Sequence, residues 1–264
     1  MSDDPQIARY RLAGLSVAAT NMDGLIAAIA HRLATRDPAT PGTYVVFRDA
    51  HGVVRAQRDA ALRAAHDDAL LVCADGWPIA AAGWLLGFPA AAQVPGIEAL
   101  EAVCQSGIAQ GWRHYFVGGR PETLAKLIAT IEARMPGIDV AGAEAPPFRP
   151  LSDAEREALR ARIRDARADI VWIGLGTPKQ ELWMHAEAPH LPGTIAMGVG
   201  AAFDVHAGEV ARAPAWLRAV GLEWFYRVLR EPRRLFGRYA VTVPGFLFLL
   251  VQMGAARLFG RRAG

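Results

Sequence analysis

The chain has 264 residues, of which 52% are hydrophobic and 21% charged, and its formal net charge is +3. These proportions exclude a disordered or fibrous chain, fit one large domain or two small ones, and give a core that needs no disulfide or metal. The two cysteines, Cys73 and Cys104, are too few for a disulfide framework and fit a reducing compartment. The first residues contain no apolar run, so we expect no secretion signal there.

Short apolar runs alternate with helical patterns along the first two hundred residues. We expect strands at Thr43–Phe47, Leu70–Cys73, His114–Val117, Ile138–Ala141, Asp169–Ile173 and Thr194–Met197. We expect helices at 50–66, 97–110 and Pro121–Arg134, and further helices that begin at Ser152 and Pro178. This alternation predicts an α/β, Rossmann-like fold, in which helices cover both faces of a parallel sheet. The carboxyl ends of the strands then share one edge, where we place the active site.

The last part of the chain differs in charge and in hydropathy. Residues 206–264 contain ten arginines and three glutamates, a net charge of +7, which leaves −4 for residues 1–205. We therefore divide the chain into a catalytic domain, 1–205, and a basic and apolar appendage, 206–264. The excess of arginine suggests an anionic partner, such as a membrane surface, nucleic acid or a phosphate-bearing substrate.

The appendage contains 18 residues without a charge, Tyr239–Ala256, with arginines on both sides. A membrane-spanning helix needs about 20 apolar residues, and this run includes Pro244 and Gln252. We therefore expect a helix that lies in the membrane interface rather than one that spans it. The alternative is a buried helix in an oligomer interface.

Two of the predicted strands end in glycines that precede a helix. Backbone amides after Gly118 and Gly119 can approach a phosphate at a helix start, although a tight turn explains the pair equally well. The run from Gly174 to Gly176 lacks the dinucleotide fingerprint, which argues against a nicotinamide dehydrogenase. Polar groups in the helix that follows suit a sugar diphosphate, whereas their spacing alone slightly favours a solvated helix face.

Asp75 and Gly76 follow the second predicted strand. A carboxylate at this position can accept a proton from a substrate, although on the sequence alone an Asx-type turn is the better explanation. The sequence contains no D-x-D motif, and His185 and His190 are wrongly spaced for a zinc pair. We therefore expect neither a metal nor another cofactor.

Seven segments between Thr43 and Tyr239 carry motifs of a known family. They are Asp75–Pro78, Phe116–Gly119, Trp172–Trp183, Gly198–Asp204, Arg212–Trp216, Gly221–Arg227 and Glu231–Arg234. In this order they resemble the WecG/TagA/CpsF family of bacterial glycosyltransferases, which are inverting enzymes of extracellular polysaccharide and wall teichoic acid assembly.

The resemblance implies a metal-independent glycosyltransferase with a membrane-associating C-terminal appendage. It implies transfer of a hexose, an N-acetylhexosamine or its uronic acid from a UDP-sugar to an undecaprenyl-diphosphate-linked acceptor. The protein would be cytoplasmic and bound peripherally to the anionic inner face of the cell membrane. It would have no nucleic acid partner, and it could form a homo-oligomer.

The resemblance also assigns roles to residues. Asp75 matches the proposed general base and Gln180 the active-site glutamine, while Arg212, Arg227, Arg234 and also Arg238 match arginines that complete the site. We expect the substrate to be bound by Asp49, Gln93, Gly118, Gly119, Gly174, Gly176, Lys179, Gly200, Phe203 and Asp204.

The sequence departs from the family pattern near the expected cleft. The family commonly has T-x-N where this chain has Phe47, Arg48 and Asp49, and often has an arginine where this chain has Gln93. Arg48 is a candidate to replace the missing charge. These changes motivate the alternative of a catalytically degenerate protein that binds a sugar nucleotide or a lipid-linked sugar. A nucleic-acid binder is disfavoured because the apolar run of the tail suits lipid better.

Overall fold

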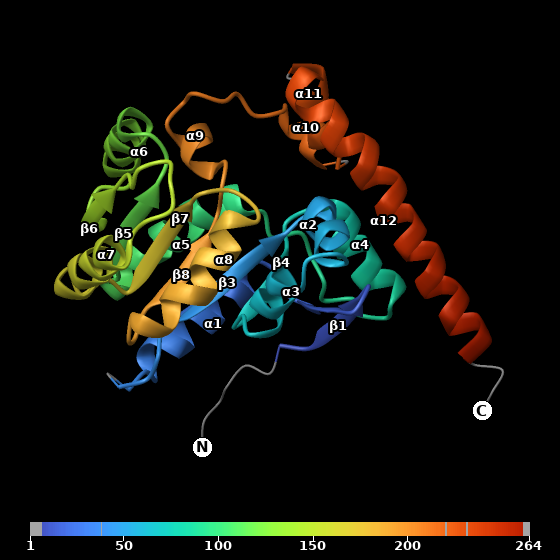
Figure 1. Ribbon diagram of the computed structural model, residues 1–264, viewed down its shortest axis with the longest axis horizontal. Coiled ribbons are helices and arrows are strands. Elements are labelled where there is room, and N and C mark those ends of the chain that lie inside the picture. The colour runs from blue at the N-terminus through green and yellow to red at the C-terminus, as the bar shows by residue number, and fades with distance from the viewer. Residues whose placement is uncertain (1–6, 38, 220, 231, 261–264) are drawn as a thin grey trace.

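A computed structural model describes residues 7–37, 39–219, 221–230 and 232–260 (Figure 1). Six parallel strands form the central sheet in the order β4-β3-β8-β7-β5-β6. The strands are β3 (Thr43–Arg48), β4 (Leu71–Ala74), β5 (Arg113–Gly118), β6 (Asp139–Glu144), β7 (Ile170–Gly174) and β8 (Ile195–Gly198). The predicted α/β fold with a parallel sheet is therefore confirmed.

Helices pack on both faces of the sheet because apolar side chains point to both sides of each strand. On β3, for example, Val45 and Phe47 belong to one buried cluster, whereas Tyr44 and Val46 belong to the other. The first cluster includes side chains from α1 (Met22–Ala34), α5 (Gly96–Gln110), α6 (Pro121–Arg134) and α9 (Ala202–His206). The second contains α3 (Ala60–Asp67), α7 (Asp153–Asp165) and α8 (Lys179–Glu187), and a short 3-10 helix, Ala188–His190, follows α8.

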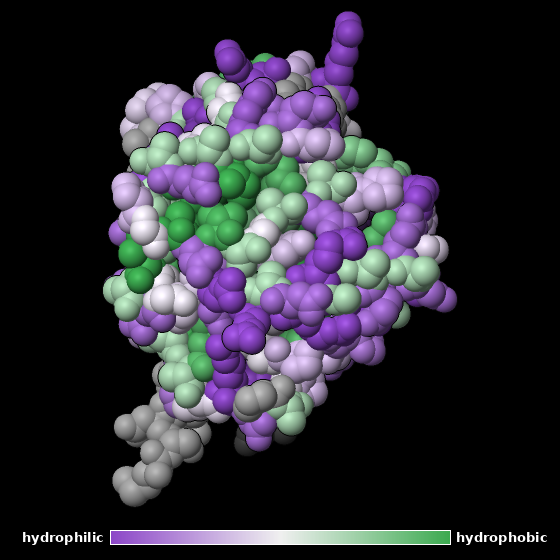
Figure 2. Space-filling view, turned by 90° about the vertical axis from the view of Figure 1, so that its left-hand side faces the viewer, coloured by the Kyte–Doolittle hydropathy of each residue, from purple (hydrophilic) through white to green (hydrophobic). Residues whose placement is uncertain are grey.

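The β6 end of the sheet carries charged helices. Arg162 of α7 donates two hydrogen bonds to Glu144, and Arg149 and Glu155 form an ion pair at the start of α7. That end of the molecule faces the viewer in Figure 2, where hydrophilic side chains are widespread.

Several elements were not predicted, and one predicted helix is wrong. A hairpin of β1 (Arg9–Leu12) and β2 (Leu15–Ala18) turns at Ala13 and Gly14, whose φ angles are 49° and 85°. The helices α1 and α4 (Trp77–Leu85) were also missed. The single helix expected at 50–66 is two helices, α2 (Ala50–Ala56) and α3, because the Asp59 side chain accepts a hydrogen bond from the Leu62 amide and caps a new helix.

The appendage forms α10 (Ala215–Ala219), α11 (Glu223–Arg230) and the long α12 (Pro232–Gly260), which runs down one side of the molecule past α2 (Figure 1). The two helices approach closely, since a Cβ on Gly245 would lie 3.0 Å from a Val54 methyl group. Phe246 is buried in the core. In the described part of the chain, one segment has the length and composition to cross a membrane, Leu235–Gly254 of α12, with a mean hydropathy of 1.4 and 17% of its apolar window buried. Core helices of soluble proteins also pass this test.

Candidate active site

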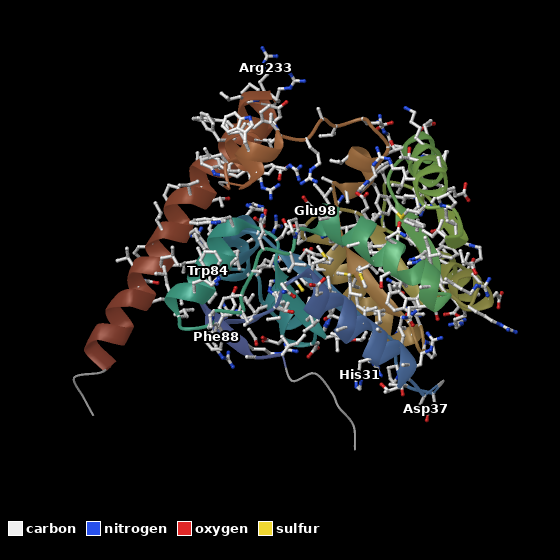
Figure 3. All side chains as sticks on the ribbon, turned by 180° about the vertical axis from the view of Figure 1, so that it is seen from behind. His31, Asp37, Trp84, Phe88, Glu98 and Arg233 are labelled. Carbon is white, nitrogen blue, oxygen red and sulfur yellow. The ribbon has the colours of Figure 1, made fainter. Side chains whose placement is uncertain are left out.

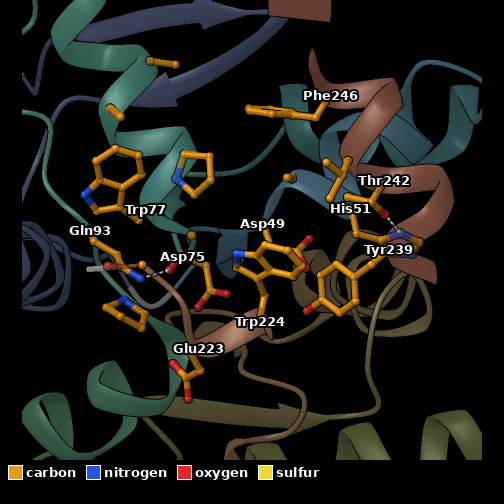
Figure 4. Close-up of a pocket in the computed structure, with 18 of the residues that line it drawn as sticks. Asp49, His51, Asp75, Trp77, Gln93, Glu223, Trp224, Tyr239, Thr242 and Phe246 are labelled. Atoms are coloured by element: carbon orange, nitrogen blue, oxygen red, sulfur yellow. Dashed lines mark hydrogen bonds between the residues drawn. The ribbon is translucent and has the colours of Figure 1, made fainter. Parts of the chain in front are cut away.

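A pocket of about 530 Å³ lies beyond the carboxyl ends of β3 and β4, between α4, α11 and α12. This is the sheet edge at which ligands bind in α/β folds. The pocket has charged and apolar lining side chains, and Figure 4 shows ten of its residues by name. The charged lining residues are Asp49, Asp75, Arg218, Glu223 and Arg238.

Asp75 directly follows β4. Its backbone amide donates to the Arg48 carbonyl at 3.0 Å, and its Oδ1 accepts a hydrogen bond from the Gly96 amide at 2.7 Å. Burial raises the pKa of Asp75 to about 6, against the effect of the Gly96 hydrogen bond, and the nearby carboxylates of Asp49, Glu98 and Glu223 raise the pKa further. Asp75 is thus a fixed carboxylate that takes up and releases a proton close to neutral pH, as a general base requires.

Asp49 follows β3 and stands in a different environment. Its Oδ1 caps α2 by accepting a hydrogen bond from the Gly52 amide at 2.8 Å, and its Oδ2 accepts one from Arg238 of α12 at 2.6 Å. Burial alone would raise the pKa of Asp49, but Arg238, Arg48 and the Gly52 amide outweigh it and hold the pKa below its usual value. Asp49 therefore stays ionised while it holds α12 over the pocket.

Gln93 also lines the pocket, as expected for a substrate-binding residue. Its side-chain amide donates to the Asp75 carbonyl at 2.8 Å and so fixes the backbone of the candidate base. Gln93 therefore supplies a polar group where the family often has a positive charge.

His51 and Thr242 join α2 to α12 across the pocket wall. The His51 Nδ1 lies 3.1 Å from the Thr242 hydroxyl. Burial and the charge of Arg238 lower the pKa of His51, so the ring is neutral near pH 7. No local sequence pattern pairs two residues so far apart, and neither was among the expected site residues.

Arg48 does not supply the missing charge, so that expectation is wrong. Its side chain is completely buried, and it donates to Glu181 of α8 at 2.7 Å. The Thr177 hydroxyl donates to the same carboxylate oxygen at 2.9 Å. Because a buried charge needs a partner, this pair joins the end of β3 to the start of α8 beneath the site rather than lining the pocket.

Gln180 is buried and does not line the pocket. Its side chain donates to the Gly198 carbonyl at 2.9 Å and accepts from the Gly176 amide at 3.1 Å. Gln180 therefore joins the end of β8 to the loop between β7 and α8.

The predicted glycines serve close packing at the ends of β5 and β7. Gly118 has a φ of 124°, and a Cβ there would lie 2.8 Å from Gly174, while a Cβ on Gly174 would lie 2.4 Å from the Phe203 ring. The Phe203 side chain belongs to the core, so its expected contact with substrate is not supported. The remaining expected residues also lie outside the pocket. Gly119, Gly176 and Gly200 lie in the loops after β5, β7 and β8, and Lys179 and Asp204 lie in α8 and α9.

The arginines of the appendage hold it against α5. Arg212 and Arg218 both donate to Glu98, at 2.6 and 2.9 Å, and Figure 3 shows Glu98 beneath the appendage. Arg218 lines the pocket but Arg212 does not. The backbones of Arg227 and Arg234 lie in α11 and α12, whereas their side chains lie outside the described residues.

No group of three or more potential metal ligands occurs among the described residues. A comparison with protein families identifies one match, which covers the sheet, the pocket and the appendage. The model of the glycosyl transferase WecG/TagA/CpsF family matches residues 10–259. This chain therefore belongs to the WecG/TagA/CpsF family of glycosyltransferases.

Proposed function

We propose that this glycosyltransferase moves a sugar from a UDP-linked donor to a sugar on undecaprenyl diphosphate, with inversion at the anomeric carbon and without a metal. The sugar is a hexose, an N-acetylhexosamine or its uronic acid. The observation that carries the proposal is the position of Asp75, a carboxylate with a raised pKa that lines a pocket at the active edge of the sheet.

In the proposed reaction, the acceptor hydroxyl oxygen attacks the anomeric carbon of the donor. Asp75 takes the hydroxyl proton, a new glycosidic bond forms, and the bond between the anomeric carbon and the diphosphate breaks, so that UDP leaves with the electron pair. Positioned base catalysis contributes typically ~10²–10⁴-fold. We expect arginines of the appendage to supply positive charge for the leaving diphosphate of UDP.

Replacing Asp75 by Asn tests the role of the base. We expect Asp75→Asn to lower the rate of UDP release at least 100-fold and to retain donor binding, since Asn can still accept the Gly96 hydrogen bond. In the wild type, kcat/KM should rise with an apparent pKa near 6 as Asp75 ionises. Asp139→Asn is the matched control, because Asp139 lies at the opposite edge of the sheet, at the start of β6. A variant Asp75→Asn with wild-type turnover would remove Asp75 from this role.

The alternative is a degenerate protein that binds the same ligands without turnover. It is favoured by Gln93, which stands where the family often has an arginine and hydrogen-bonds the backbone of Asp75. Saturable UDP-sugar binding by the wild type, with no UDP release in the presence of lipid-linked acceptor, would support this alternative.

We further propose that the enzyme acts at the cytoplasmic face of the cell membrane, where α12 lies in the interface. Apolar side chains that do not contact the core are exposed along this helix, and arginines stand on both sides of its uncharged stretch. The exposed side chains are Phe236, Val241, Val243, Leu247, Phe248 and Val251.

A further inference from the structure

One half of the pocket is apolar and lies between α4 and α12. Trp77, Ala81 and Leu85 come from α4, and Phe246, Leu247 and Leu250 come from α12. Figure 4 shows Trp77 and Phe246 on one side of the two carboxylates, Asp49 and Asp75, and Glu223 on the other. The pocket is therefore divided into an apolar groove and a charged end.

The apolar groove suits a hydrocarbon better than a nucleotide. A uracil or ribose has several donors and acceptors, and these would lose water without gaining partners between such walls. The Thr242 hydroxyl, which α12 contributes to the pocket, is already within hydrogen-bond distance of His51. A hydrocarbon chain has no polar groups that would lose hydrogen bonds, and its transfer from water to an apolar groove is favourable.

The apolar groove opens to the surface beside the exposed apolar face of α12. Leu85 is 80% exposed and Leu247 57% exposed, so apolar side chains continue from the pocket to the surface. Trp84 of α4 is also exposed on the side of the molecule that faces α12 (Figure 3). The same end of the pocket thus meets the exposed apolar face of α12.

The charged end has unused donors for an anion. Arg218 and Arg238 line the pocket, and each donates one hydrogen bond to a carboxylate, whereas a guanidinium group has five N–H donors. Two guanidinium groups with spare N–H donors fit phosphate oxygens. The pocket is therefore complementary to an amphiphile with an anionic head and an apolar chain.

We propose that the groove between α4 and α12 holds the first isoprene units of a polyprenyl diphosphate, with its diphosphate at Arg218 and Arg238. The inference rests on the proposed function, because it assigns part of that site to the lipid of the acceptor. A volume of about 530 Å³ is that of an ordinary small-molecule pocket, so a long polyprenyl chain continues past Leu85 and Leu247 into the membrane.

Binding of farnesyl diphosphate, a short soluble polyprenyl diphosphate, tests the groove independently of sugar transfer. Trp77 and Trp224 line the pocket, so their fluorescence reports the titration. We expect farnesyl diphosphate to bind at least tenfold more tightly than inorganic diphosphate, which lacks the apolar chain, and than farnesol, which lacks the diphosphate. Equal affinity for farnesyl diphosphate and inorganic diphosphate would overturn the proposal.

Substitutions in the groove locate the binding. Ala81→Trp fills the space between the helices, and we expect it to weaken farnesyl diphosphate binding at least tenfold while UDP binding stays unchanged. Ala125→Trp, at an exposed position of α6, is the matched control. Leu85→Glu is a second variant at an exposed position that folding tolerates, and it should weaken the same binding.

The outcomes separate the two proposals. One result would be that the wild type binds farnesyl diphosphate and Ala81→Trp loses that binding, although the wild type never releases UDP. That result would contradict the proposed function but support the lipid groove. Wild-type binding in both Ala81→Trp and Leu85→Glu would overturn the groove, whatever the sugar-transfer assay shows.

Discussion

Asp75 and Asp49 end neighbouring strands, yet the fold shifts the pKa values of their carboxyl groups in opposite directions. The folded state holds a proton on Asp75 more tightly than the unfolded state does, so the stability gained is complete below pH 4 and is lost as the pH rises through about 6. We therefore expect Asp75→Asn to be more stable than the wild type at pH 8, by up to ~3 kcal/mol for a shift of about two pKa units. Urea unfolding at pH 8 and pH 4 measures the difference, which should disappear at the lower pH.

Asp49→Asn is the control for this prediction, with the opposite sign. Its pKa is lowered in the fold, so the ionised group stabilises the protein above its unfolded pKa, and that stability is lost as the pH falls. Asp49→Asn should therefore be less stable than the wild type at pH 8. Two variants with the same pH dependence would contradict both assignments.

Single residues of the site were predictable where they end a strand. Asp75 and Asp49 directly follow β4 and β3 and line the pocket, since the carboxyl ends of parallel strands share one edge, whereas Gln93, in the loop before α5, was expected there by resemblance alone. The roles of Gln180 and Phe203 were not predictable in the same way, because only the folded structure shows that the Gln180 amide is used by two backbone groups and that Phe203 is in the core. Arg238 was matched by resemblance, but its ion pair with Asp49 joins residues far apart in the chain and leaves no local pattern.

At the scale of elements, the packing of α12 on α2 forms one wall of the pocket. Gly245 allows the contact, since a side chain there would meet Val54 at 3.0 Å. We expect Gly245→Leu to displace α12, to destabilise the protein by about 1–3 kcal/mol as overpacking does, and to lower turnover because Arg238 and Phe246 move with the helix.

Thermal unfolding and UDP release check this prediction, and the same helix supplies its control. Nothing lies within 4 Å of a Cβ on Gly254, so Gly254→Leu adds the same side chain without a clash. This variant should keep its stability or gain slightly from helix propensity. Equal losses in both variants would show that α12 does not depend on its contact with α2.

The predicted elements are confirmed where the apolar pattern is strong and local. All six strands of the parallel sheet were expected, because they are short apolar runs between turns. The hairpin of β1 and β2 was missed because its short strands, RYRL and LSVA, contain charged or polar residues and form no apolar run. The helix α4 was missed because an almost wholly apolar helix has no clear periodicity. The split of 50–66 into α2 and α3 depends on one cap, Asp59, that the helical pattern obscured.

At the scale of the whole molecule, α12 contacts the domain at several points between Leu235 and Met253. Leu235 and Phe246 are buried, and the Met253 sulfur accepts a hydrogen bond from the Ala13 amide at 3.2 Å. A helix packed in this way has one side occupied by protein, so it cannot be surrounded by lipid as an isolated spanning helix is. We therefore keep the interfacial arrangement as our proposal, in which only the outer side of α12 enters the membrane.

Flotation with lipid vesicles tests this arrangement in the full-length protein. We expect the wild type to float with vesicles that contain phosphatidylglycerol and to be released by high salt, because each arginine near an anionic surface contributes only ~1 kcal/mol and salt screens it. The double variant Phe248→Glu, Val251→Glu places charge on the exposed side of α12 and should lose most of the flotation while its thermal stability is unchanged. Phe148→Glu changes an aromatic residue that is even more exposed, in the segment before α7, and should float normally. A double variant that floats like the wild type would show that α12 is not the membrane contact.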